Sequence, residues 1–441
     1  MKRGAASQLR NSAAAVGYFV IPVAIVLFSP WWLLLAIVAG VAALLALTRA
    51  GRQMLSVTRI GISTIPQRLG ASSVVVVGIA GVVAVLVALL AMAQGFQQTL
   101  RETGNDETAI VMRAGSQTEL NSVLDHDTAV LVSQASQVMH GPRGQPIASP
   151  ELVVVASLPK KATGLDANVE LRGVGERAWD LRPNVQITVG RKFRPGLREL
   201  IAGKDAQRQF AGIEPGSTVK LNEQVWTVVG GFDSGDSHNS ELWGDTDIIG
   251  SAYRRGSSTS SVTVRLTTPE AFDAFKAALQ ADKRVQVDVS TTRSYYNAQS
   301  DTISTIIRIL GTVVGAIMAI GAVFGALNSM YAAVATRTRE IATLRAIGFR
   351  GTPVVVSVMI ETLLLALLGG AIGAGLAWAI FDNYTASTLG SNFSQVVFAF
   401  RVTPELLWDG LKWALTIGLV GGLFPALRAA RQPVTAGLRE L

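Results

Sequence analysis

Apolar residues are gathered into runs long enough to cross a lipid bilayer, and this feature restricts the fold more than any other. Residues 74–93 form twenty positions without a charge, residues 309–327 nineteen, and residues 362–381 twenty. A shorter Gly-rich run, 413–427, extends back toward 406 only if Asp409 and Lys412 lie near the membrane interface. Because a bilayer core needs about 20 apolar residues per helix, the sequence predicts at least four transmembrane helices.

The composition agrees with a membrane protein. Charged residues make up 16% of the 441 positions and hydrophobic residues 49%, whereas soluble chains carry about 25% charged residues. The sequence contains no cysteine, which excludes disulfides, thiolate-bound zinc and thiol nucleophiles within it.

The net charge of +8 has a topological origin. Residues 49–73 hold four arginines and no acid, residues 336–352 hold four arginines and one glutamate, and the tail after 427 holds three arginines and one glutamate. With Lys2, Arg3 and Arg10, these segments contain 14 basic and 2 acidic residues, and the rest of the chain contains 25 and 29. Basic loops stay in the cytoplasm, so the charge orients the helices, and we expect no nucleic-acid partner.

The first apolar stretch, residues 16–47, is too long for one ordinary span because it holds 32 uncharged residues. Ser29 and Pro30 interrupt it, and a hairpin turning there keeps both basic flanks in the cytoplasm, with Trp31 and Trp32 at the outer interface. The alternatives are one span or a cleaved signal peptide, whose basic start and short apolar run are similar.

Residues 97–300 have the composition of a folded soluble domain on the outer side of the membrane. Helical spacing of Ala, Phe and Leu after Pro269 predicts a helix at 269–280, so we expect an α+β domain. Segments rich in β-branched residues predict strands at 109–112, 129–132, 152–155, 185–189, 225–229 and 262–266.

No catalytic or metal-binding motif is present. The three histidines, His126, His140 and His238, form no close pair, and HExxH, GxSxG and DxDxDG are absent. The absence of GxxxxGK[ST] means that any driving ATP binds to another subunit. We interpret one acid-rich segment as a solvated loop rather than an oxygen-ligand metal site; it contains Asp233, Asp236, His238, Glu241, Asp245 and Asp247.

The segment 335–350 between two spans has the pattern of an amphipathic helix. Ile341, Leu344 and Ile347 fall on one stripe, Gly348 suits the helix C-terminus, and Pro353 follows. Arg337, Glu340 and Arg345 fall largely elsewhere. Taken alone, such a segment is typical of a helix on the membrane surface.

This segment, together with residues 422–434 (GLFPALRAARQPV) and Leu438-Arg439, resembles the FtsX-like, MacB-type permease family of ABC transporters. Residues 171–174 and 190–199 resemble that family's periplasmic core domain. The resemblance runs from about Arg59 to the C-terminus and implies one span, a large extracytoplasmic domain and three further spans. That plan agrees with the topology derived from charge, whereas the predicted hairpin departs from it.

The resemblance also implies that residues 336–349 are the coupling helix, which docks on a separate ATPase. The residues expected to couple are Thr336, Arg337, Arg339, Glu340, Ile341, Leu344, Arg345, Ile347, Gly348 and Phe349. It further implies that residues 96–102 and 295–308 form a stalk, with Arg308 at the outer membrane surface.

Glu361 lies about two turns into the third family-type span, where a carboxylate is expensive. We hypothesise that it anchors the inner end of this span to the coupling helix; the alternative is a protonated or packed group within the bundle. Small residues in GxxxG pairs favour helix packing within one subunit over a dimer interface. The pairs are Gly311/Gly315, Gly321/Gly325, Gly369/Gly373 and Gly418/Gly422.

The sequence therefore predicts an α-helical integral membrane protein with a large α+β extracytoplasmic domain. We divide it into a hydrophobic hairpin (1–48), a cytoplasmic basic elbow (49–73), a transmembrane helix (74–96), the extracytoplasmic domain with stalk ends (97–300), a transmembrane helix (301–335), the coupling helix (336–352), a transmembrane helix (353–381), a short extracytoplasmic loop (382–405), a transmembrane helix (406–427) and a cytoplasmic tail (428–441).

The family resemblance implies a non-catalytic permease subunit in the bacterial inner membrane that transmits movement to its periplasmic domain. ATP and magnesium are expected in the partner ATPase and no cofactor in this chain. Further expected partners are a second permease, as homodimer or heterodimer, a periplasmic adaptor, an outer-membrane channel and membrane lipid. Export is the leading function; regulation of an extracytoplasmic enzyme and lipoprotein release are alternatives, and the size of the outer domain disfavours regulation.

Overall fold

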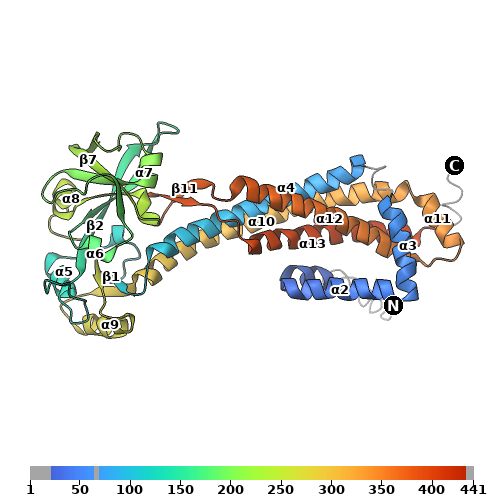
Figure 1. The fold of residues 1–441 in the computed structure, drawn as a ribbon, viewed down its shortest axis with the longest axis horizontal. Coiled ribbons are helices and arrows are strands. Elements are labelled where there is room, and N and C mark those ends of the chain that lie inside the picture. Colours follow the sequence, from blue (N-terminus) through green and yellow to red (C-terminus); the bar gives the residue numbers. More distant parts are fainter. Residues whose placement is uncertain (1–20, 64–68, 434–441) are drawn as a thin grey trace, which may run out of the picture. The chain divides into compact units, whose positions relative to one another are not determined.

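The computed structural model describes residues 21–63 and 69–433. Two compact units make up the chain (Figure 1). The helical unit contains residues up to Met92, Ile307–Asn383 and the chain from Arg401 onward, and the α+β unit contains Ala93–Ile306 and Tyr384–Phe400. Lys2, Arg3, Arg10, Arg68 and the tail from 434, which the sequence places in the cytoplasm, lie outside the described residues.

Four long helices dominate the helical unit: α4 (Leu69–Thr103), α10 (Thr292–Ala335), α12 (Gly351–Phe381) and α13 (Pro404–Arg431). Within residues 21–63 and 69–433, these four helices are long and apolar enough to cross a membrane, and a bent pair near the start raises the number to five if it forms one span. The predicted class, a helical membrane protein with an α+β domain between the first two family-type spans, is confirmed.

Glycines let these helices approach closely. A side chain at Gly373 would overlap the backbone of Ala80 in α4, and one at Gly369 would lie 2.8 Å from the Val76 carbonyl oxygen. Gly418 and Gly422 face α12, and Gly311 and Gly315 face α4, whereas Gly321 and Gly325 have no neighbour within 4 Å. Three of the four GxxxG pairs therefore serve packing inside this chain.

Helices α4 and α10 are longer than a membrane requires. The 44 residues of α10 correspond to about 66 Å at 1.5 Å per residue, roughly twice the hydrocarbon core. Both helices have residues in each unit. Inside the α+β unit their ends are joined by a hydrogen bond of 2.8 Å from Gln97 Nε2 to Asp301 Oδ1. The predicted stalk segments are thus continuous helix.

The described N-terminal part contains a helix over residues 21–28, a break at Ser29-Pro30, and α2 (Trp31–Leu47). Helix α3 (Arg49–Ser63) follows after a bend of 99° between α2 and Arg49–Arg59. Val57 and Thr58 of α3 are buried. The hairpin over residues 16–47 stays a prediction, since its first residues, like any cleavable signal segment, lie outside the described ranges.

A mixed sheet forms the frame of the α+β unit. Its strand order is β10-β1-β9-β2-β3-β8-β5-β7-β4, with β6 paired to β7. Strand β2 bridges two halves, because its first residues pair with β9 and its later residues with β3. The strands are β1 (Thr108–Arg113), β2 (Ala148–Pro159), β3 (Asp166–Val174), β4 (Gln186–Gly190), β5 (Glu199–Gly203), β6 (Thr218–Leu221), β7 (Gln224–Asp233), β8 (Glu241–Asp245), β9 (Ser261–Arg265) and β10 (Val287–Thr291).

Each half of the sheet has its own apolar core. Phe275 packs with Val111 of β1 in one cluster, and Trp226 and Phe210 pack with strands β2, β3 and β5 in another. Short helices complete the unit: α5 (His126–Ser133), α6 (Ala178–Leu181), α7 (Lys204–Gln209), α8 (Thr246–Ala252), α9 (Phe272–Ala281), η2 (Glu119–Asn121), η3 (Ser237–Ser240) and η4 (Pro269–Ala271).

The predicted strand at 129–132 is wrong, because these residues lie in helix α5. Asp125 is the N-cap, and its side chain accepts a hydrogen bond of 2.7 Å from the Thr128 amide. Ala129 and Val132, three positions apart, are the buried pair on its inner face. Capping and packing thus overrode the β-branched composition. The other five predicted segments lie in β1, β2, β4, β7 and β9, and α9 occupies the predicted helix.

The segment between α12 and α13, predicted as a short extracytoplasmic loop over 382–405, contains a β-hairpin. Strand β11 (Thr385–Leu389) pairs antiparallel with β12 (Gln395–Ala399). The hairpin belongs to the α+β unit. There Phe398 meets Phe96 of α4 edge to face at 5.5 Å between ring centroids. The outer domain is therefore assembled from two separate parts of the sequence.

Candidate functional site

The segment predicted to couple contains a shorter helix than expected. Helix α11 covers Thr338–Ala346 and ends before Gly348, whose φ of 104° closes the turn. Ile341 is 7% exposed and packs against apolar residues from three long helices. Those residues are Met330 and Val334 of α10, Val354 and Val358 of α12, and Ala426 and Ala429 of α13.

Arg337 precedes α11 and points into the helical unit. Its Nη1 donates to Glu361 Oε2 at 3.0 Å, and its Nε donates to Glu340 Oε2 at 3.3 Å. The Arg337 side chain is only 12% exposed and that of Glu361 4%. The structure thus brings together Glu361 and the segment that the sequence analysis linked to it.

Arg345 makes a second internal contact, donating from Nη1 to the carbonyl oxygen of Gln432 just after α13. Leu344 and Phe349 are half-buried. Together with Ile341 and Arg337, Arg345 ties α11 to the ends of α12 and α13. Three residues of the predicted coupling set, Arg337, Ile341 and Arg345, therefore hold α11 against the long helices.

Other members of the set face outward. Thr336, Arg339 and Gly348 are exposed, and the Glu340 side chain is 53% exposed. Ile347 was expected on the same helical stripe as Ile341 and Leu344, but α11 ends at Ala346 and Ile347 is 69% exposed. We call Thr336, Arg339, Glu340, Ile347 and Gly348 the outward face of the α11 segment.

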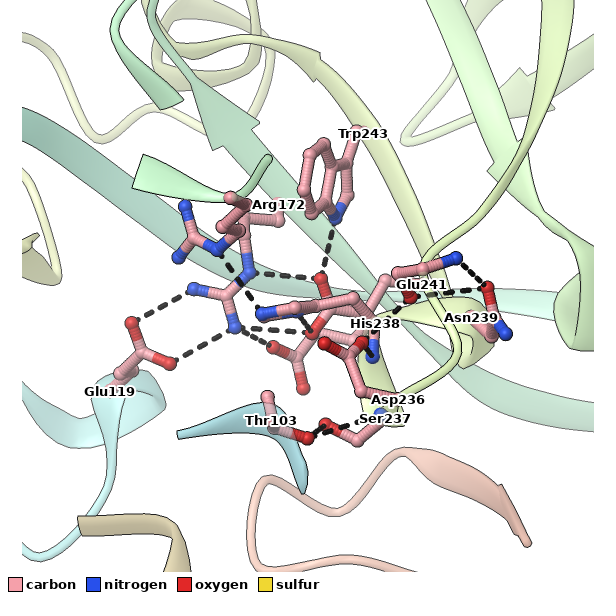
Figure 2. Close-up of polar contacts among 12 residues, drawn as sticks. Thr103, Glu119, Arg172, Asp236, Ser237, His238, Asn239, Glu241 and Trp243 are labelled. Carbon is pink, nitrogen blue, oxygen red and sulfur yellow. Dashed lines mark hydrogen bonds and ion pairs between the residues drawn. The ribbon is translucent and has the colours of Figure 1, made fainter. Parts of the chain in front are cut away.

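A second polar site lies inside the α+β unit, centred on Arg172 of β3. Figure 2 shows its guanidinium between Glu119 and Glu241. Arg172 Nη1 lies 2.9 Å from Glu119 Oε1 and 3.0 Å from Glu151 Oε2, and its Nε lies 2.9 Å from Glu241 Oε2. Its Nη2 donates to Glu170 Oε1 at 2.8 Å. One guanidinium, 1% exposed, therefore serves four buried carboxylates.

Neighbouring side chains complete this network. Arg182 donates to both oxygens of Glu151 at 2.6 and 2.9 Å. Trp243 Nε1 donates to Glu241 Oε2 at 2.7 Å, and His238 Nδ1 lies 3.0 Å from Glu241 Oε1. Every carboxylate here is hydrogen-bonded to an arginine, which lowers the cost of burying it.

The pKa values of these carboxyl groups are shifted in opposite directions. Although burial opposes ionisation, Arg172 and His238 hold the pKa of Glu241 well below its usual range. Burial likewise opposes ionisation of Glu151, yet Arg182 and Arg172 lower its pKa. In contrast, burial and the adjacent charge of Glu241 raise the pKa of Glu170 to about 7. Glu170 is therefore a buried carboxyl group whose pKa is raised to about 7.

The interpretation of the acid-rich segment as a solvated loop is wrong. Asp236, His238 and Glu241 are buried, with exposed fractions of 5%, 2% and 5%. Asp233 binds Lys204 at 2.6 Å, and Asp245 caps α8 through the Asp247 and Ile248 amides. Among the residues that the structure describes, no group of three or more His, Cys, Asp or Glu side chains is arranged to hold a metal ion.

Sequence reasoning missed Glu119, Glu151, Glu170, Arg172 and Arg182 as a site. They come from η2, β2, β3 and the segment after α6, which are separated in the sequence and meet only in the folded α+β unit. Parallel pairing of β3 with β8 sets Arg172 beside Trp243 and Glu170 beside Glu241. The one available signal was the charge of Glu151, Glu170 and Arg172 within otherwise apolar strand sequences.

Two family models match the chain. The model of the FtsX-like permease C-terminal region matches residues 312–434, and that of the MacB-like periplasmic core domain matches residues 72–282. Together they cover well over half of the sequence. The chain therefore belongs to the FtsX-like permease family and carries a MacB-type periplasmic core domain, which confirms the resemblance seen in the sequence.

The sequences of curated relatives are about a quarter identical to this chain where they align. The macrolide export ATP-binding/permease protein MacB of Burkholderia pseudomallei (strain 1710b) is 24% identical over 305 residues, covering 64% of this chain and 45% of that protein. The probable syringafactin export ATP-binding/permease protein SyfD of Pseudomonas syringae pv. tomato is 25% identical over 313 residues, covering 65% and 45%. The chain thus spans about 45% of the length of these relatives.

Solved structures resemble parts of the chain. The periplasmic region of MacB from Actinobacillus actinomycetemcomitans has 17% identity and a TM-score of 0.33, covering 46% of this chain and 92% of that one. The extracellular domain of the transporter YknZ from Gram-positive bacteria has 14% identity and a TM-score of 0.32, covering 42% and 100%.

Proposed function

We propose that this chain is the non-catalytic permease subunit of an ABC transporter and couples ATP hydrolysis by a separate ATPase to movement of its α+β unit. The observation that carries the proposal is the attachment of α11. The Arg337–Glu361 pair, Ile341 and Arg345 join this helix to the ends of three long helices. A force applied to the outward face of the α11 segment would therefore act on the whole helical unit.

The sequence and the relatives' names support a separate ATPase. Those relatives are named as ATP-binding and permease proteins in one chain, whereas the 441 residues of this protein contain no GxxxxGK[ST] motif. We infer that ATP and magnesium bind to a partner subunit and that Arg339 and Ile347 contact it. An exposed arginine and an exposed apolar side chain on the same segment suit a protein partner.

Transmission to the outer side requires stiff elements. Helices α4 and α10 run without a break from the helical unit into the α+β unit. A second route is the β11–β12 hairpin, which the chain joins directly to α12 and α13. We place the protein in the bacterial inner membrane and propose export, with a second permease, a periplasmic adaptor and an outer-membrane channel as further partners.

Affinity purification from native membranes in mild detergent, followed by mass spectrometry, tests the proposal. We expect an ATPase to co-purify with the unaltered chain and to fall at least tenfold in the double variant Arg339→Glu/Ile347→Asp. The control is Leu197→Asp/Arg198→Glu, the same kinds of change at exposed residues of the α+β unit. Absence of an ATPase from the unaltered chain, or equal recovery with the α11 variant, would contradict the proposal.

A further inference from the structure

The β11–β12 hairpin is held to the sheet by polar contacts, and one side chain receives two of them. Asn392 Nδ2 and Ser394 Oγ both donate to Glu170 Oε2, at 3.1 and 3.2 Å. Asn168 Nδ2 donates to the Phe393 carbonyl at 3.0 Å, and the Val397 amide donates to Ser240 Oγ at 2.9 Å. Glu170 is thus the ionisable group at the centre of this junction.

The charges around Glu170 do not balance. Arg172 and Arg182 supply two positive charges, whereas Glu119, Glu151, Glu170 and Glu241 supply four carboxyl groups. Arg182 Nε donates to His238 Nε2 at 3.1 Å, and His238 Nδ1 lies 3.0 Å from Glu241 Oε1. Ionisation of all four carboxyl groups would bury more carboxylates than the two arginines can pair, which is costly.

Polar atoms near Glu170 can accommodate a proton. A cavity of about 30 Å³ is lined by Glu170, Asn392 and Gln299, which is room for a water molecule. Within the described residues, Asn392 Oδ1 and Gln299 Nε2 have no hydrogen-bond partner, although Asn392 is only 7% exposed. If the Asn392 amide turns over, its oxygen accepts from a protonated Glu170, which satisfies the buried acceptor.

We propose that Glu170 is a proton-binding site that locks the β11–β12 hairpin onto the sheet: the hairpin is held when Glu170 carries a proton and is loosened when the carboxyl group ionises. The ligand is a proton bound between Glu170 and the loop 390–396. The site thereby links the pH on the outer side of the membrane to a connection between α12, α13 and the α+β unit.

The direction of the pH effect follows from the environment of Glu170. Its pKa is raised first by burial and then by the charges of Glu241 and Glu119. Arg172 and Asn392 lower the pKa, and the net value is about 7. Three other titratable groups lie at the junction. Tyr296 of α10 lines the cavity, His238 contacts Glu241, and Lys160 donates a hydrogen bond to Gln395. The loop 390–396 carries none.

When the hairpin leaves, Glu170 gains water, and because burial is the largest cause of its shift, its pKa falls toward the ordinary 4.5. The docked state therefore binds the proton more tightly. Docking is fully stabilised below the ordinary pKa and weakens as pH rises through about 7.

The absence of cysteine from the sequence allows a clean test by spin labelling. Cysteines replace Leu165 and Leu389, which are 71% and 52% exposed, in the full chain in lipid nanodiscs, and the label distance is measured from pH 5.5 to 8.5. We expect one narrow distance population at pH 5.5 and a second, broader one that grows with a midpoint near pH 7. A pH-independent distribution would overturn the proposal.

Two substitutions, with a third as control, identify the titrating group. Glu170→Gln, a permanent mimic of the protonated form, should keep the narrow population at every pH, whereas Glu214→Gln, which removes an exposed partner of Lys161, should leave the midpoint unchanged. Asn392→Asp keeps the side-chain shape and adds a carboxyl group, so the midpoint should rise by about one pH unit. An unshifted midpoint in Asn392→Asp, or a transition retained in Glu170→Gln, contradicts the proposal. No ATPase takes part, so the outcome is independent of the proposed function.

Discussion

At the scale of residues, the Arg337–Glu361 pair explains how a carboxylate is tolerated inside a transmembrane helix. The sequence singled out Glu361 by its position, and Arg337 by its place in the coupling segment. What the sequence could not show is that Arg337 turns inward while Arg339, two residues later, is exposed. That division depends on where α10 ends and α11 begins, which local patterns fix only to within a few residues.

Breaking this pair should destabilise the helical unit. Removing one partner of a buried ion pair typically costs about 3–5 kcal/mol, so Arg337→Ala should lower the thermal unfolding midpoint of the purified full chain and weaken ATPase recovery. Glu361→Ala should do the same. Arg339→Ala, at an exposed position, is the stability control and should change unfolding little. A Glu361→Ala chain with unchanged unfolding and intact ATPase coupling would remove the anchoring role.

The Arg172 network predicts a specific acid response of the α+β unit. The pKa of Glu241 and that of Glu151 are lowered in the folded protein. Their contribution to stability is therefore present above the ordinary carboxyl pKa of 4.5 and is lost as the pH falls below that value.

Arg172→Met leaves four carboxyl groups short of a cation and should increase proteolysis of the α+β unit at pH 7 by an order of magnitude or more. The effect should shrink toward pH 5, where protons replace the missing charge. Protease resistance equal to that of the unaltered chain at pH 7 would show that the network is not structural.

At the scale of elements, apolar length predicted the transmembrane helices well because twenty uncharged residues have few alternatives. Strands were predicted from β-branched content, and this rule failed at 129–132, where Asp125 caps α5. The β11–β12 hairpin was missed because its two strands have five residues each and flank a loop of ordinary composition. Its stability comes from contacts with the distant sheet, which no local pattern reveals.

Helix packing offers a matched pair of substitutions in α12. Gly373→Ala places a methyl group against the backbone of Ala80, which cannot move aside easily, so α4 and α12 must separate. Gly375, two residues later, has no neighbour within 4 Å, and Gly375→Ala should be neutral or slightly stabilising through helix propensity. We expect the unfolding midpoint to fall by several degrees for Gly373→Ala alone. Equal behaviour of the two variants would mean that this helix contact is absent in the membrane.

At the scale of the whole molecule, the class, the number of long spans and the presence of an outer α+β domain could be predicted from the sequence. The strand order could not, because β1 pairs with β9 and β10 across more than 140 residues, and β2 links both halves of the sheet. Nor could the contribution of residues 384–400 to the α+β unit. Such long-range pairings depend on global packing rather than on local propensity.

We propose that events at the outward face of the α11 segment reach the α+β unit through the chain. The most direct measurement is hydrogen exchange, read by mass spectrometry, on the complex purified from native membranes, with and without nucleotide trapped in the partner ATPase. We expect altered exchange in peptides of α11 and also in peptides from 93–306 and 384–400, although we place the nucleotide in the partner ATPase. Altered exchange confined to α11, with every peptide of the α+β unit unchanged, would contradict it.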